Sequence, residues 1–436
     1  MEAVLDKIKV EKYSSYKNSG AEWLGDIPTH WNTLSNKNIF KLKKNQVGKK
    51  SSDYVLLSLT LNGVIKRDME NPQGKFPAEF NTYQEVKKGD FIFCLFDVEE
   101  TPRCVGLSDF DGMITGAYTV MEPYDNFDRN FLYYFNLNLD ADKRMKPLYT
   151  GLRNTISKEN FFSFKTFVPP LLEQTAIAAF LDRKTALIDQ AIDIKQKQIE
   201  LLKERRQILI HKVVTRGLNP NVQLKDSGVE WIGEIPEHWQ VKRFKHFTKI
   251  LSGYSPEQVK FSEEMKINYF KVDDLNNVDE NFRLGNSNWF VEHLKIAKVY
   301  SSNILLIPKR GGAIGTNKIA VTTTDCIFDT NVMGLEFNLL KVNIDLIAIW
   351  LKSRNLITIA DTTTIPQINN KHIYPLEIAL PKLEEQTEII QYIKTSSQKL
   401  NTAISLKEQE IEKLKEYKAT LINSAVTGKI KVSATV

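Results

Sequence analysis

The sequence lacks any apolar run close to the roughly 20 residues that a membrane-spanning helix needs. Its first residues, MEAVLDKIKVEKYSSYKNSG, contain no apolar signal core, so export is not expected. Cysteine is scarce, and Cys94, Cys104 and Cys326 form no CxxC pair, which excludes a disulfide framework. We therefore expect a cytoplasmic protein without a membrane segment.

A strong charge of one sign is also missing. The chain has 59 Lys and Arg against 53 Asp and Glu, a net charge of +6 over 436 residues. This mildly basic balance permits a nucleic-acid partner without demonstrating one.

The motifs of common enzyme classes are absent as well. The segment NQVGKKSSD (45–53) contains Gly48-Lys49, but Lys43, five residues before Gly48, stands where a phosphate-binding P-loop needs its first glycine. The glycine-rich segment RGGAIG (310–315) has no acidic partner of the dinucleotide-binding type, and no HExxH, GxSxG or Asn-Pro-Pro-aromatic motif occurs. The acidic pairs Glu99-Glu100 and Asp273-Asp274 fit solvated loops better than metal sites. We expect a chain that catalyses no reaction by itself and holds no metal or cofactor.

The sequence contains an internal repeat, in which the same motifs occur twice in the same order. AEWLGDIPTHW begins at Ala21 and VEWIGEIPEHW at Val229, while VPPLLEQTAIAAFL begins at Val168 and LPKLEEQTEIIQYI at Leu380. We call the first phrase the Trp box and the second the junction. Between them lie two stretches of unlike sequence, which we call body one (32–167) and body two (240–379). The period of about 210 residues indicates a duplicated domain rather than a solenoid.

A long helix is predicted after each junction. Proline precedes it, acidic residues occupy its first turn, and no Pro or Gly follows until Gly217 and Gly428. A helix of about 42 residues, roughly 60 Å long, needs a partner along its length. A 3.5-residue spacing selects matching residues in both copies, which favours an antiparallel coiled coil over two separate amphipathic helices. The predicted seam comprises Leu181, Thr185, Ile188, Ile192, Lys195, Ile199, Leu202, Arg206, Leu209 and Val213, with Ile393, Ser397, Leu400, Ile404, Lys407, Ile411, Leu414, Lys418, Leu421 and Ala425.

The bodies have the pattern of mixed α/β domains. Helices are expected at 130–146 and 344–355. Strands are expected within 52–60, 89–96, 112–123 and 161–170, and within 267–272, 303–308, 318–323 and 373–381.

Each Trp box allows two interpretations. The box holds two tryptophans, and His30 or His238 precedes the second one. A catalytic or metal-binding histidine would need a second ligand at suitable spacing, and none is present. We favour a packing anchor that clamps the start of each domain.

The duplicated Trp box, the two divergent bodies, and the long helices after PPLLEQ and PKLEEQ together resemble the specificity (S) subunits of type I restriction–modification systems. The resemblance covers essentially the whole chain. It implies that each body is a target recognition domain for one half of a bipartite, asymmetric DNA site. It also implies that the helices set the spacing and dock modification subunits, expected to be two, with restriction subunits joining the full complex. S-adenosylmethionine, ATP and Mg would belong to those partner subunits, in the cytoplasm of a bacterium or archaeon.

The expected fold class is therefore mixed α+β, with two α/β target recognition domains joined by two long antiparallel coiled-coil helices and related by a pseudo-two-fold internal repeat. The expected division is a first recognition domain with its Trp box (1–169), spacer helix one (170–216), a second recognition domain with its box (217–381), and spacer helix two with the tail (382–436).

Two segments of each body are candidates for contact with DNA. One follows the central strand, LFDVEETPRCVG in body one and PKRGGAIGTNK in body two; the other precedes the junction. Lys and Arg suit phosphates, Arg, Asn and Gln suit base edges, and glycines let a backbone approach a phosphate closely. Body one lacks the paired glycines and is acidic in its loop, which weakens the phosphate-loop hypothesis there. The candidate residues are Arg103, Arg153, Asn154, Lys158, Lys309, Arg310, Thr316, Lys318, Gln367, Asn370 and Lys371. The same segments also contain Gly151, Ser157, Gly311, Gly312, Asn317, Thr363, Thr364 and Asn369.

Two alternatives remain open. A coiled-coil scaffold carrying two protein- or glycan-binding modules would explain the duplication and the low charge, but not the Lys/Arg-glycine loop. A self-contained restriction enzyme conflicts with the missing catalytic motifs.

Overall fold

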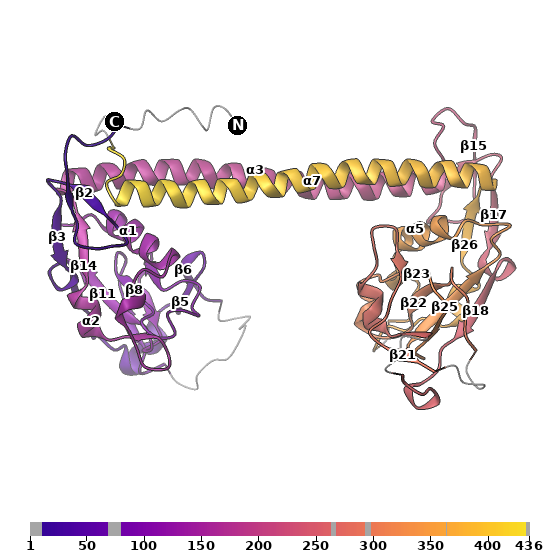
Figure 1. Ribbon diagram of the computed structural model, residues 1–436, viewed down its shortest axis with the longest axis horizontal. Coiled ribbons are helices and arrows are strands. Elements are labelled where there is room, and N and C mark those ends of the chain that lie inside the picture. The colour runs from indigo at the N-terminus through magenta and orange to yellow at the C-terminus, as the bar shows by residue number, and fades with distance from the viewer. Residues whose placement is uncertain (1–10, 69–79, 263–266, 293–297, 363, 433–436) are drawn as a thin grey trace. The chain divides into compact units, whose positions relative to one another are not determined.

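The computed structural model describes residues 11–68, 80–262, 267–292, 298–362 and 364–432 (Figure 1). The chain divides into two compact units, each built from distant parts of the sequence. Unit 1 comprises Met1–Gln196 with Gln409–Val436, and unit 2 comprises Lys197–Glu408. The four-part division expected from the sequence stays a prediction. Within the described residues, none of the helices combines the length and apolar character needed to cross a membrane.

The two long helices are confirmed. Helix α3 spans Leu171–Arg216, 46 residues, and α7 spans Leu383–Val426, 44 residues (Figure 1). Each begins shortly after a junction proline, with acidic residues in its first turn, and each is followed by a glycine with positive φ. Both helices contribute to both units.

The predicted seam is confirmed, because all of its positions are buried or half-buried. In unit 1, Asp189 of α3 accepts a hydrogen bond from Lys418 of α7 at 2.7 Å. Further along α3, Lys195 donates to Glu410 at 2.5 Å, so the partner lies earlier along α7. The helix segments of this unit therefore run antiparallel.

Unit 2 contains the same kind of pair. Arg206 of α3 donates to the side-chain oxygen of Asn401 of α7 at 2.6 Å. Positions 189 and 401 lie 212 residues apart, as do positions 206 and 418, so this contact is the repeat of the Asp189–Lys418 pair. The duplication thus preserves the side-chain contacts that set the register of the helices, as well as the apolar seam.

Unit 1 places body one on the helix pair. Its four-stranded antiparallel sheet has the order β4-β11-β8-β9, and smaller pairs are β1-β2, β3-β14, β5-β6, β7-β10 and β12-β13. The strands are β1 (Tyr16–Asn18), β2 (Asp26–Pro28), β3 (Asn32–Ser35), β4 (Phe40–Leu42), β5 (Leu57–Thr60), β6 (Gly63–Lys66), β7 (Gln84–Val86), β8 (Phe91–Phe93), β9 (Val105–Leu107), β10 (Gly112–Ile114), β11 (Thr119–Pro123), β12 (Tyr149–Thr150), β13 (Thr155–Ile156) and β14 (Lys165–Val168). Helices α1 (Arg129–Ala141) and α2 (Lys158–Ser163) complete it.

Unit 2 repeats this plan with additions. The order β18-β25-β22-β23 matches that of the first sheet, and β20 extends it; a three-stranded sheet β21-β19-β24 and the pairs β15-β16 and β17-β26 complete the strands. The strands are β15 (Leu224–Asp226), β16 (Glu234–Pro236), β17 (Gln240–Arg243), β18 (Thr248–Ser252), β19 (Ile267–Phe270), β20 (Arg283–Leu284), β21 (Phe290–Val291), β22 (Leu305–Pro308), β23 (Ala320–Thr322), β24 (Cys326–Phe328), β25 (Val332–Phe337) and β26 (Glu377–Leu380). The helices are α4 (Gly312–Gly315), α5 (Ile344–Arg354) and α6 (Asn370–Ile373).

The predicted strands and the two body helices are confirmed, but several expected ends are wrong. Residues 52–53 lie in a 3-10 helix (Gly48–Asp53), residue 373 is the last residue of α6, and α1 ends at Ala141 and not at 146. The segment 161–170 was expected to be extended throughout, but residues 161–163 belong to α2. Ser157 caps this helix by accepting the N–H of Asn160 at 3.1 Å, and Phe161 is fully buried. A local cap and one buried aromatic therefore override the β-propensity of the phenylalanines.

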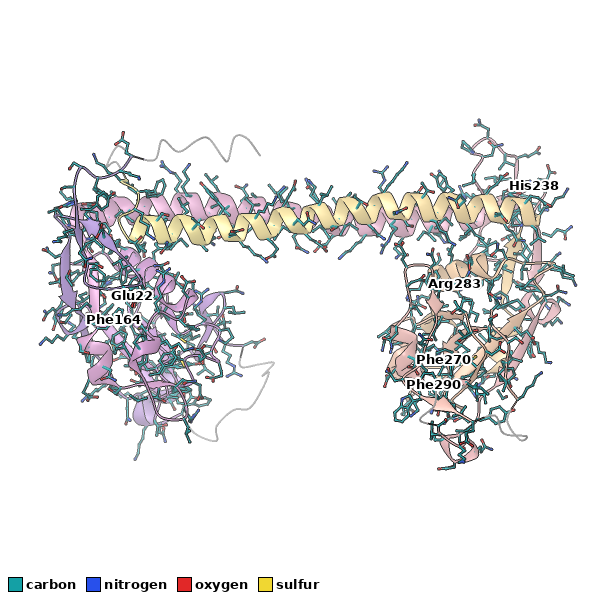
Figure 2. All side chains as sticks on the ribbon, in the orientation of Figure 1. Glu22, Phe164, His238, Phe270, Arg283 and Phe290 are labelled. Carbon is teal, nitrogen blue, oxygen red and sulfur yellow. The ribbon has the colours of Figure 1, made fainter. Side chains whose placement is uncertain are left out.

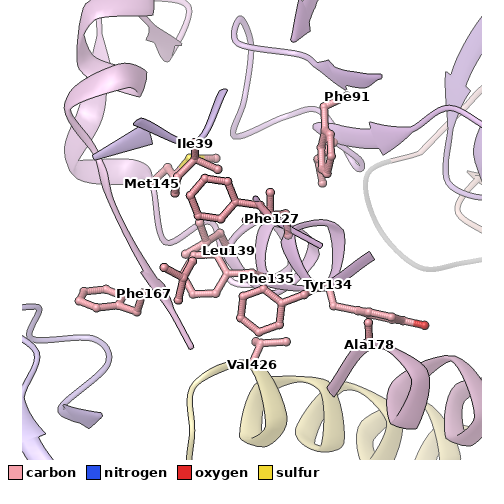
Figure 3. Close-up of a cluster of buried hydrophobic side chains, with 14 of the residues drawn as sticks. Ile39, Phe91, Phe127, Tyr134, Phe135, Leu139, Met145, Phe167, Ala178 and Val426 are labelled. Atoms are coloured by element: carbon pink, nitrogen blue, oxygen red, sulfur yellow. The ribbon is translucent and has the colours of Figure 1, made fainter. Parts of the chain in front are cut away.

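Each body shares its core with both long helices. In unit 1 the buried side chains of α1 pack against Ala178 of α3 and Val426 of α7 (Figure 3). In unit 2, Val213 of α3 and Ile389 of α7 join the core of body two. In each unit, the start of one long helix and the end of the other belong to the same hydrophobic core as the body. This shared core fixes the position of each body on its own segments of the helix pair.

Candidate nucleic-acid interface

The first Trp box is tied to the start of α3. Trp31 is fully buried, and its indole N–H donates to Glu173 Oε1 at 3.0 Å. The other oxygen of this carboxylate lies 2.7 Å from His30 Nε2. The Tyr13 hydroxyl donates to Glu173 at 2.6 Å, and its pKa rises because of burial and this carboxylate.

The second Trp box repeats these contacts. Trp239 is buried and donates to Glu385 Oε1 at 3.0 Å, and Nε2 of His238, labelled in Figure 2, lies 2.9 Å from Glu385 Oε2. The packing-anchor interpretation is confirmed. The sequence showed both glutamates in their first turns, but gave no signal that they would contact the boxes.

The glutamine of each junction fixes the body helix. Gln174 accepts the N–H of Asp128, the N-cap of α1, at 2.9 Å, and donates to Pro169. Gln386 accepts the N–H of Asn343, the N-cap of α5, at 2.8 Å. The same buried amide thus positions equivalent helices in both copies, which holds each body in a defined orientation on its own part of the frame.

The two candidate segments of body one lie side by side. Asp97 donates its N–H to the carbonyl of Arg153 at 2.8 Å, and Ile156 donates to Leu95 at 2.8 Å. The loop after β8 and the segment around β13 therefore form one continuous surface.

Body two brings its two candidate segments together in the same way. Gly311 donates its N–H to Pro366 at 3.0 Å, and Ile368 donates to the carbonyl of Lys309 at 2.9 Å. Arg310 and Gln367 face each other in an antiparallel bridge. The sequence predicted two segments per body, and the structure joins them into one site in each.

Several polar side chains of the body-one site are held by carboxylates. Arg153 forms a two-point contact with Asp97, and the guanidinium holds the pKa of that carboxyl below its usual value. Asn154 donates from its side chain to Glu100 at 3.1 Å. Lys158 is exposed at the start of α2.

Arg103 lies apart from these exposed cations. Its side chain is half-buried beside the Tyr133 phenol. Burial raises the pKa of Tyr133, and the nearby guanidinium opposes that rise. Arg103 is therefore less accessible than the exposed Arg153.

The body-two candidates are more open. Arg310, Thr316, Gln367, Asn370 and Lys371 are exposed, while Lys309 and Lys318 are half-buried. The Arg310 side chain has no ion pair with another residue that the structure describes. Thr363 lies outside the described residues.

The glycine loop of body two leaves its backbone accessible. A Cβ built on Gly311, Gly312 or Gly315 would meet nothing within 4 Å. Asn317, by contrast, donates to the Lys352 carbonyl at 2.8 Å and accepts the N–H of Leu356, so its side chain closes the loop and is not free for DNA. Asn369 likewise caps α6 by accepting the N–H of Lys371 at 3.2 Å.

The sequence-based selection missed an exposed apolar side chain beside each site. Leu152 is 104% exposed and Ile365 is 56% exposed. Both residues lie in otherwise polar segments, and this contrast in the sequence could have indicated that they are exposed. If these segments contact DNA, an exposed aliphatic side chain there would suit the thymine methyl group. Among the described residues, no cluster of His, Cys, Asp and Glu is arranged to hold a metal.

Comparison with known proteins agrees with this duplicated architecture. Residues 236–416 match the family model described as "Type I restriction modification DNA specificity domain". The type I restriction enzyme MjaVIII specificity subunit of Methanocaldococcus jannaschii is 25% identical over 340 residues, covering 74% of this chain and 75% of the relative. The putative type I restriction enzyme MjaX specificity subunit of the same organism is 24% identical and covers 94% and 96%.

The fold also has a counterpart among solved structures. A chain from a study of complex assembly and conformational transition of the type I R-M system covers 92% of this chain and 98% of its own length, with a TM-score of 0.69 and 14% identity. In sequence, the chain is therefore similar to the specificity subunits of type I restriction enzymes, over 94% of its length for one relative, and the solved structure has a similar fold.

Proposed function

We propose that this chain gives a type I restriction–modification complex its DNA sequence specificity, with each body recognising one half of a bipartite, asymmetric site. One observation carries the proposal. The two sites have the same backbone frame, in which Ile156 donates to Leu95 and Ile368 donates to Lys309, but they present different side chains. A constant frame with changed contents is what two unlike half-sites require.

The candidate residues have distinct roles in this proposal. Arg153, Asn154 and Gln367 suit base edges because of their donor and acceptor groups, and Arg153 and Gln367 are exposed while Asn154 is half-buried. Lys158, Arg310, Thr316, Asn370 and Lys371 suit phosphates, because they are exposed on loops or first helical turns. Arg103, Lys309 and Lys318 are less accessible, and we expect them to contact DNA only at the edge of the interface.

The paired helices would fix the spacing of the two half-sites. Half-site spacing is a geometric property of the scaffold, and a helix pair with ionic register contacts is stiffer than a flexible linker. The bases between the half-sites would remain unread.

A row of exposed apolar residues on α3 supports docking of partner subunits. Leu187, Ile194, Leu201 and Ile208 are seven residues apart in turn, and their exposures are 43%, 50%, 62% and 60%. A heptad spacing places such residues on one helix face. We propose that modification subunits, two in number, bind the long helices, and that restriction subunits join them. S-adenosylmethionine, ATP and Mg would be bound by those partners, and this chain would catalyse no reaction itself.

Methylation mapping tests the proposed function. The chain would be expressed with its cognate modification subunit, and N6-methyladenine would be located in the host DNA. The expected result is a split, asymmetric motif, of which only one half changes when residues 32–168 are exchanged for those of a relative. A well-folded complex that methylates no motif would instead favour the alternative of a scaffold with two binding modules.

A further inference from the structure

We propose that Asp97 is a positioning residue that holds Arg153 in the orientation needed to read a guanine in the half-site of body one. The inference rests on the proposed function, because it assumes that body one contacts DNA. It deepens that function by assigning a base preference to one residue pair.

The geometry of the pair defines which donors remain free. Arg153 Nε donates to Asp97 Oδ1 at 2.9 Å, and Nη2 donates to Oδ2 of the same carboxylate. This side-on pairing leaves the two N–H groups at the tip of the guanidinium, one on Nη1 and one on Nη2, parallel and unused by Asp97. Two parallel donors match the O6 and N7 acceptors of guanine in the major groove.

The guanidinium is restrained but accessible. The Arg153 side chain is 69% exposed, and its central carbon lies 5.7 Å from the centre of the Phe96 ring. Phe96 in turn stacks on Tyr118, with ring centres 6.0 Å apart. An arginine fixed by a carboxylate and an aromatic face loses less rotamer freedom on binding than a free arginine does.

The backbone beneath the pair is also fixed. Asp97 adopts a left-handed conformation with φ of 47°, and its N–H is bonded to the Arg153 carbonyl at 2.8 Å. The corresponding donor in body two is Gly311, with φ of 81°. Body one therefore has Asp97 at a positive φ that favours glycine. Such backbone strain is expected where the side chain has a functional role.

Buried polar contacts brace the loop that carries Asp97. The buried carboxylate of Asp140 in α1 accepts the N–H of Cys104 at 2.8 Å and a proton of Lys143 at 2.7 Å. Lys143 also donates to the carbonyl of Thr101 at 2.7 Å. These contacts tie the loop 97–104 to α1, so Asp97 is presented from a rigid support.

Base-resolved methylation tests the inference. Complexes of the full chain with its modification subunit would be assayed on duplexes that carry each base pair at every position of the mapped half-sites. Asp97→Asn should lower the discrimination at a single G·C pair in the body-one half by about tenfold, because the guanidinium loses its charged support. Arg153→Lys should lower discrimination at the same pair, and the double variant should be no worse than Arg153→Lys alone.

Glu99→Gln is the matched control. Glu99 lies in the same loop and pairs with Lys146 at 3.2 Å, so this variant makes the same change in charge without touching Arg153. It should leave discrimination at every position unchanged. Equal effects of Asp97→Asn and Glu99→Gln would overturn the inference, as would a loss of rate shared by all bases. If the unaltered complex methylates no split motif, the proposed function itself fails, and the inference fails with it.

Discussion

Glu385 accepts the indole N–H of Trp239 at 3.0 Å, and this contact ties the second Trp box to the first turn of α7. The same relationship joins Glu173 and Trp31 in the first copy. In each unit one carboxylate therefore links the chain that enters the body to the helix that leaves it.

Removing this carboxylate should weaken unit 2. Glu385→Ala leaves the buried Trp239 N–H without an acceptor, which should lower the free energy of unfolding by roughly 2 kcal/mol. Glu385→Gln keeps a neutral acceptor and should cost about half as much. Urea unfolding followed by tryptophan fluorescence measures both changes.

Glu384→Ala is the control for this prediction. Glu384 is the neighbouring acidic residue of the first turn and is exposed. It shares the favourable interaction with the helix dipole but does not bond to Trp239. A comparable loss of stability in Glu384→Ala would show that the dipole, and not the indole contact, is responsible.

Gly428 should tolerate no side chain. Its φ is +71°, and a Cβ would lie 2.4 Å from Cδ of Pro28 in the first Trp box. Gly428→Ala combines left-handed strain with this clash and should cost more than about 2 kcal/mol in unit 1. Gly228 has the same φ but nothing within 4 Å of its Cβ position, so Gly228→Ala should cost only about 1 kcal/mol. Equal destabilisation in chemical unfolding would contradict the close packing.

The helices and strands that the two copies share could be predicted from the sequence, because they depend on patterns that repeat. The coiled-coil seam, the two junction helices and the body strands all follow from periodicity and from proline and glycine boundaries. A duplication strengthens such patterns, because a match at an offset of 212 residues tests each assignment twice, as at Arg206 and Lys418.

The sites were predictable only in part. Residue type selected Arg153 and Arg310, but whether an arginine is paired depends on contacts between segments far apart in the chain, such as 97 with 153. Ser157 and Asn369, which were also selected by residue type, accept backbone N–H groups at the starts of α2 and α6. The pairing of Arg153 is decided by a long-range contact, which leaves no local pattern. The two caps are local contacts, so a search for N-cap residues could have identified them.

The exposed row on α3 should be needed for assembly. Leu201→Lys with Ile208→Lys places two charges where we propose a partner subunit packs. Each buried aliphatic side chain contributes about 1.5–3 kcal/mol, so the double variant should weaken binding of the modification subunit by a hundredfold or more. Analytical ultracentrifugation or calorimetry of the mixed subunits measures this.

The corresponding positions of α7 give the control for assembly. Lys413 and Thr420 lie 212 residues after Leu201 and Ile208 and are exposed. Lys413→Ala with Thr420→Ala should leave assembly unchanged. If both double variants lose binding equally, the row on α3 is not the docking surface.

Arg310 should contact a phosphate and not a base. It is exposed, has no ion pair among the described residues, and stands beside a glycine loop whose backbone is open. Arg310→Ala should weaken DNA binding by the assembled complex about equally for all sequences and reduce the slope of log affinity against log salt by about 1. Fluorescence anisotropy over a series of salt concentrations measures both quantities.

Arg243 provides the matched charge control for Arg310. It is exposed in the same body but pairs with Glu377 at 2.8 Å, so its charge is already balanced within the protein. Arg243→Ala should therefore leave the salt slope unchanged, because counterion release requires a cation that reaches a phosphate. If Arg310→Ala instead removes discrimination at one base pair and leaves the salt slope intact, Arg310 reads a base. The glycine loop would then serve specificity in body two, as the acidic loop is proposed to do in body one.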